Sequence, residues 1–295
     1  MGTFLGHLVP GLALTLLGLW HIINTSRNYF AKGSSNFKSR FWHPFTASAP
    51  IFKHSELLLV FSFSIFAIFA QLFDFPFLRL PFELDGIEHA TMFLHLAIFS
   101  GFSLFAEINH KAETLSGVVG VLAASVFGQE LLLLHFHSAD HVGLEGHYHW
   151  LLQLIVLVSF VSSLAAICIP TSFPASLVLA ISVTFQGCWF MDMGFFLWVP
   201  EFVPKGCTTQ SIYASKELVH GTVTCGSSDA DSRARALANL QFSWMLAGIL
   251  FLTGSLCLKL AGKCTESGQH TEYERLQGKG AELPLSYDGV RQSQP

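Results

Sequence analysis

Charged residues are scarce in this 295-residue sequence. Only 12% of its residues are Asp, Glu, Lys or Arg, whereas soluble domains carry roughly 25%. So few charges cannot solvate a globular surface of this size, and a soluble domain is excluded. The net charge of -4 and the lack of a long basic run leave nucleic-acid binding without the positive surface it needs. Six cysteines in a chain this long do not make a disulfide scaffold.

Long apolar runs are what the sequence has in abundance, since 51% of it is hydrophobic. A membrane-spanning helix needs about 20 mostly apolar residues, whereas transmembrane β-strands are roughly 10 residues long with alternating polarity, a pattern absent here. The sequence therefore predicts an all-α polytopic membrane protein, a seven-transmembrane helical bundle with spans at about 3–23, 55–75, 87–109, 115–136, 149–168, 174–199 and 238–260. We expect residues 1–260 to form the transmembrane domain and the polar residues 261–295 a disordered cytosolic tail.

The distribution of Lys and Arg predicts the orientation of the bundle, because cytosolic loops carry an excess of both. With seven spans, eleven of the 16 basic residues fall on the side of the C-terminus: Arg27, Lys32, Lys38, Arg40, Lys53, Lys111, Lys259, Lys263, Arg275, Lys279 and Arg291. Five fall on the other side: Arg79, Lys205, Lys216, Arg233 and Arg235. We therefore expect a lumenal or extracellular N-terminus and a cytosolic C-terminus, in an endomembrane or the plasma membrane.

The 200–237 connection holds a candidate disulfide. Cys207 and Cys225 are its only cysteines, and the predicted orientation places this connection on the oxidising side of the membrane, where disulfides form and persist. The alternative is two unpaired loop cysteines.

Ionisable and amide side chains gather toward the lumenal ends of the predicted spans. Such groups are costly inside a membrane and usually face the bundle interior or a cavity. The set comprises His7, Glu88, His89, Glu130, His135, His137, Asp140, His141, His147, His149, Gln186, Asp192, Asn239 and Gln241. The bundle is thus expected to be polar and histidine-rich toward the lumen and mainly apolar toward the cytosol.

Four of these residues are candidate metal ligands. Glu130 and His137 lie seven residues apart and so share a helix face; with His89 and His149 they offer the imidazole and carboxylate groups that zinc prefers. Glu130 would be a fourth ligand or a base beside the metal. Two alternatives stay open: histidines that only bond water, headgroups or neighbouring helices, and a bis-histidine haem.

Several segments resemble the transmembrane protein 45 family. They are Gly6 to Gly11, Leu17 to Trp20, Glu88 to Met92, Glu130 to His137, His149 to Leu152 and, above all, Phe185 to Phe190 continuing to Phe195. The resemblance spans most of residues 1–260. It implies a multi-pass membrane protein without a settled biochemical activity, and with its long 200–237 loop the chain is similar to plant members, which are linked to virus response.

Three functions are compatible with these features. The first is a scaffold, or another role without known chemistry, whose evident partner is the lipid bilayer. The second is a zinc-dependent intramembrane lipid hydrolase, in which Glu130 or Asp192 would act as the base for a metal-bound water. The third is a transporter or channel that uses the lumenal polar cavity; against it, no pair of Gly- or Pro-broken helices occupies matching positions in two halves.

Overall fold

The computed structural model describes residues 4–45, 50–73, 84–140, 143–214 and 217–280. Within this part of the chain, seven helices are long and apolar enough to cross a membrane, which confirms the predicted all-α polytopic fold. They are α1 (Phe4–Lys32), α2 (Ser55–Leu72), α3 (Leu84–Ile108), α4 (Ser116–Asp140), α5 (Gly143–Cys168), α6 (Phe173–Trp198) and α7 (Ser228–Gly280). Short 3₁₀ turns occupy Ser34–Asn36, Pro50–His54 and Pro200–Phe202.

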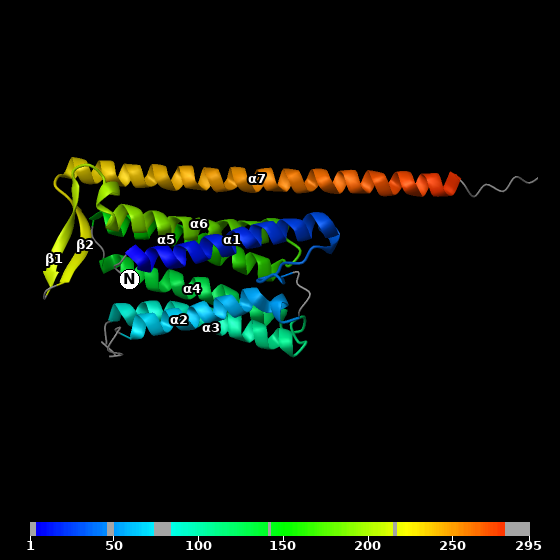
Figure 1. The fold of residues 1–295 in the computed structure, drawn as a ribbon, viewed down its shortest axis with the longest axis horizontal. Helices are drawn as coiled ribbons and strands as arrows, with labels where there is room; N and C mark the ends of the chain where they lie inside the picture. The colour runs from blue at the N-terminus through cyan, green and yellow to red at the C-terminus, as the bar shows by residue number, and fades with distance from the viewer. Residues whose placement is uncertain (1–3, 46–49, 74–83, 141–142, 215–216, 281–295) are drawn as a thin grey trace, which may run out of the picture.

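The helices pack in pairs. α1 lies against α6, α2 against α3 and α4 against α5, while α5–α6 and α3–α4 contacts join the pairs into one bundle. α7 runs along the outside of this bundle and packs on α1, α5 and α6 (Figure 1). Six helices thus enclose the centre of the molecule, and the seventh covers one side.

A two-stranded antiparallel hairpin precedes α7, formed by β1 (Cys207–Ala214) and β2 (Glu217–Cys225). It lies at the end of the bundle where α1 begins (Figure 1). Cys207 pairs with Cys225 in the strand register, and a disulfide joins them, with an S–S distance of 2.05 Å. The sequence predicts a loop for the 200–237 connection. The connection instead contains a hairpin that the disulfide closes and that packs on α5, α6 and α7.

Glycines bring α1 and α6 into close contact. A Cβ atom at Gly187 would lie 2.6 Å from the carbonyl oxygen of Gly11, and one at Gly18 would lie 2.7 Å from the Cα of Thr184. No real side chain fits at such distances. Small residues allow this backbone approach between membrane helices, where dispersion and local hydrogen bonds hold helices together.

Helix ends differ from the prediction more than helix cores do. α1 continues to Lys32 rather than ending at 23, and α7 starts at Ser228 rather than 238. Ser227 explains the early start, because its Oγ accepts a hydrogen bond from the backbone N–H of Ala230 at 3.2 Å in the manner of an N-cap. α7 extends as far as Gly280, past the predicted domain boundary at residue 260, and the disordered cytosolic tail over 261–295 stays a prediction.

Candidate functional site

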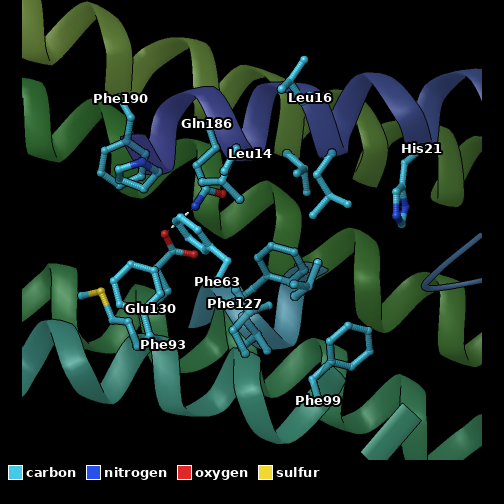
Figure 2. A pocket seen from close by; sticks show the side chains of 18 of the residues that line it. Leu14, Leu16, His21, Phe63, Phe93, Phe99, Phe127, Glu130, Gln186 and Phe190 are labelled. Atoms are coloured by element: carbon cyan, nitrogen blue, oxygen red, sulfur yellow. Dashed lines mark hydrogen bonds between the residues drawn. The ribbon is translucent and has the colours of Figure 1, made fainter. Parts of the chain in front are cut away.

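A cavity of about 710 Å³ lies among α1 to α6. Its walls are mainly leucine, valine and phenylalanine side chains, and none of the described residues of α7 lines it. Figure 2 shows Phe63, Phe93, Phe127 and Phe99 converging from α2, α3 and α4 on this space. The volume lies within the roughly 300–1,000 Å³ typical of small-molecule sites.

The cavity wall includes exposed residues on α1 and α2. Leu16 of α1 and Leu59 of α2 both line it, yet their side chains are 59% and 66% exposed. In a membrane-spanning bundle, residues exposed at mid-helix face lipid. This side of the cavity wall therefore borders the bilayer.

One end of the cavity carries a carboxylate–amide pair. Glu130 projects from α4 and Gln186 from α6, and the two side chains point toward each other (Figure 2). The Gln186 Nε2 group donates a hydrogen bond to the Glu130 Oε1 atom. Gln186 is 1% exposed, and its Oε1 atom has no hydrogen-bond partner among the described residues.

Four more ionisable residues line the same half of the cavity: His7, His89, Glu145 and His149, all of them buried. The rings of His7 and His149 lie 6.4 Å apart, edge to face, and His7 packs on Trp198 at 4.3 Å. His149 Nδ1 lies 3.0 Å from the backbone oxygen of Glu145. His7, His89, Glu130, His149 and Gln186 thus all line one cavity, and their role as one functional polar site stays a prediction.

The predicted zinc ligands are only partly brought together. His89, Glu130 and His149 line one cavity, but among the described side chains no group of three His, Cys, Asp or Glu residues could hold a metal ion. Glu130 is turned toward Gln186 and His149 toward its own helix. The side chains of His137 and Asp140, and all of His141, lie outside the described residues, so the zinc set stays a prediction.

The remaining predicted polar residues lie outside the cavity lining. Glu88 is half-buried at the start of α3, and Asp192 is six residues beyond Gln186, which turns it to another side of α6. His147 and Tyr148 of α5 bond Asn239 and Gln241 of α7, at 2.9 and 2.8 Å. His135 is within 3.4 Å of Gln153 Oε1 on α5. Of this set, His135, His147, Asn239 and Gln241 thus tie helices together rather than face the cavity.

Sequence reasoning missed a second polar cluster at the opposite end of the cavity. Glu56, 5% exposed, accepts hydrogen bonds from the Trp20 indole N–H and the His43 backbone N–H, each at 2.8 Å. His21 Nε2 lies 2.8 Å from its other oxygen. The available signal was a lone acid in the first turn of the very apolar α2.

His43 completes this second cluster from the connection between α1 and α2. Its ring lies 4.9 Å from that of His21, edge to face, and its Nε2 atom lies 3.3 Å from the Thr25 hydroxyl. Burial lowers the pKa of His43 from 6.5 to about 2, and the neighbouring His21 and Arg40 act in the same direction. The imidazole is therefore neutral in the folded protein.

Comparison with known proteins agrees with this architecture. Residues 116–258, which cover α4 to most of the α7 span, match a family of unknown function (DUF716). The chain is 25% identical over 231 residues to transmembrane epididymal protein 1 of Rattus norvegicus and 26% identical over 216 residues to transmembrane epididymal protein 1A of Mus musculus. Each match covers 68% of this chain and 68% of the relative. The chain is thus an integral, multi-pass membrane protein with relatives among transmembrane proteins.

Proposed function

We propose that this protein binds a long, largely apolar molecule from the bilayer inside its six-helix cavity. The single observation that carries the proposal is the cavity itself, about 710 Å³, apolar along its length and polar at both ends. The exposure of the lining residues Leu16 and Leu59 at the side of the bundle supports a ligand that arrives from lipid rather than from water. Apolar burial of a ligand contributes about 25 cal/mol per Å² before the costs of association.

The proposal includes the orientation expected from the sequence, with the N-terminus and hairpin lumenal or extracellular and the C-terminus cytosolic. The excess of Lys and Arg on the C-terminal side and the disulfide in the hairpin both support it. We also propose that the chain is a plant member of the transmembrane protein 45 family, because its 200–237 connection is long, as in the plant members. The link to virus response stays an expectation of that resemblance.

A saturable photo-crosslinking experiment tests the cavity. The purified full-length protein is labelled with a long-chain alcohol carrying a diazirine, and the modified peptides are mapped with and without excess unlabelled alcohol. We expect competed labels on the cavity-lining faces of α1 to α6. Competition-insensitive labels alone would contradict the proposal, because they report only the lipid-facing surface.

A matched pair of variants on α1 sharpens this test. Ala13 lines the cavity, whereas the adjacent Leu12 is 51% exposed and does not line it. Ala13→Trp should remove most of the competed labelling by filling the cavity, and Leu12→Trp should preserve it. Equal labelling of the two variants, with equal thermal stability, would show that the ligand lies elsewhere.

The zinc hydrolase is the second candidate, favoured by one observation: three of its four expected ligands line the cavity. The described side chains do not form a metal-binding group, so no reaction step is derived from it. Elemental analysis of the purified protein decides this point. One zinc ion per chain that is lost in Glu130→Gln would establish the zinc site that this candidate needs. A preparation that takes up no zinc on addition of the metal would exclude the site.

A further inference from the structure

Resting on the proposed binding function, we infer that the Glu130–Gln186 pair is the headgroup site of the cavity, and that it takes a single-chain amphiphile whose head donates hydrogen bonds. An amine or a hydroxyl satisfies this chemistry, whereas a carboxylate or phosphate does not. The inference follows from which polar atoms at this end already have partners and from the charges around them.

Gln186 supplies the first argument. Its side chain is 1% exposed and lines the cavity, and its Nε2 group is committed to Glu130. Its Oε1 atom has no hydrogen-bond partner among the described residues. A buried acceptor without a partner is unfavourable because it has lost its hydrogen bonds to water, so a ligand that donates to this oxygen removes an existing penalty.

The charges at this end supply the second argument. Two acids, Glu130 and Glu145, line the same half of the cavity, and the lining includes no Lys or Arg. An anionic head would therefore enter a low-dielectric site beside two acids, with only the buried histidines His7, His89 and His149 to offset its charge, which is unfavourable. A neutral hydroxyl can donate to either oxygen acceptor, and an ammonium gains the attraction of the acids as well.

The opposite end supplies the third argument, because it is already satisfied. Both oxygens of Glu56 are engaged, by Trp20, the His43 backbone and His21. Between the two ends the lining is apolar, including Leu17, Val60 and Phe99. The ligand therefore places its head at Glu130 and its chain toward His21. The length available to the chain follows from α1, where His21 is fourteen residues beyond His7, or about 21 Å at the rise of an α-helix.

Competition among ligands that differ only in the head tests the inference. An alkyl amine, an alcohol and a carboxylate of equal chain length compete with the diazirine alcohol for the wild-type protein at neutral pH. We expect the amine and the alcohol to displace the probe at concentrations at least about tenfold below the carboxylate, because they can donate a hydrogen bond to the Gln186 oxygen and the carboxylate cannot. A carboxylate that competes equally well would overturn the inference.

Variants then assign the effect to the pair. Glu130→Gln should remove the advantage of the amine over the alcohol, and Glu113→Gln, the same change at an exposed acid outside the lining, should leave the order intact. An unchanged order in Glu130→Gln would also overturn the assignment, and the wild-type series decides the headgroup chemistry even if that variant is unstable. If all three ligands compete equally, the cavity proposal survives and only the headgroup site fails; if none competes, both fail.

Discussion

Among single residues, Glu56 is the side chain on which the folded state depends most clearly. It is buried and receives three hydrogen bonds, which link α1, α2 and the connection between them. Glu56→Ala leaves the Trp20 and His43 N–H groups without their acceptor. We expect a loss of about 3 kcal/mol or more in unfolding free energy, measured as a fall of several degrees in Tm in detergent. Glu113→Ala, at an exposed acid, should leave Tm unchanged, and equal effects of the two would contradict this role.

His43 makes the stability of the same cluster depend on pH. Its folded pKa of about 2 lies below its ordinary value of 6.5, so below pH 6.5 the unfolded chain binds a proton that the folded chain does not. Stability is therefore lost as the pH falls, by about 2 kcal/mol between pH 7 and pH 5. His43→Gln should show a smaller fall in Tm over this range than the wild type.

A histidine on the surface provides the control for this prediction. His110 is exposed, with a φ of 55°, and asparagine tolerates that conformation. His110→Asn should keep the wild-type dependence of Tm on pH. If His43→Gln also keeps it, the acid sensitivity arises elsewhere in the protein.

Residue-level predictability differed between the two ends of the cavity. His7, His89, Glu130, His149 and Gln186 were expected together because each is near the predicted lumenal end of its span and alternate spans reverse direction. The contact between Glu56 and His43 could not be predicted, because the 33–54 connection has no periodic pattern that fixes where its side chains lie. The sequence also does not fix the direction in which each side chain points. Glu130 was expected beside histidines, and in the structure it faces Gln186.

Among the elements, the contact of α1 with α6 sets the shape of the cavity, and its glycines make it testable. A methyl group at Gly187 would overlap the α1 backbone near Thr15, forcing the two helices apart. We expect Gly187→Ala to destabilise the protein by about 1–3 kcal/mol, read as a lower Tm. Gly248→Ala in α7, where a Cβ would meet nothing within 4 Å, should be neutral or stabilising by up to about 1 kcal/mol. A Gly187→Ala protein as stable as the wild type would contradict the close contact.

The existence of the helices followed from the sequence, but their ends did not. Apolar length identifies a span because the bilayer core has a fixed thickness. It says nothing of how far a helix continues into water, and so α1 and α7 are longer than their apolar runs. The hairpin was not predicted, because its strands lie in a short polar segment. In such a segment, alternating polarity does not distinguish a strand from a loop.

For the whole molecule, the decisive property is sidedness, since it determines whether the polar half of the cavity faces the lumen. Cys168 is exposed at the end of α5, and Cys225 lies beyond α6 in the hairpin. One membrane span, α6, separates them. The proposed orientation puts Cys168 in the cytosol and Cys225 outside.

Two single-cysteine proteins test this arrangement. One retains only Cys168; the other retains only Cys225, whose thiol is freed by Cys207→Ser. With the protein in the plasma membrane of intact cells, a membrane-impermeant maleimide should label the Cys225 protein directly and the Cys168 protein only after permeabilisation. The reverse pattern would invert the orientation and place Glu130 toward the cytosol. Labelling of both from one side would mean that α6 does not cross the membrane, and the lateral route from lipid into the cavity would then lose its basis.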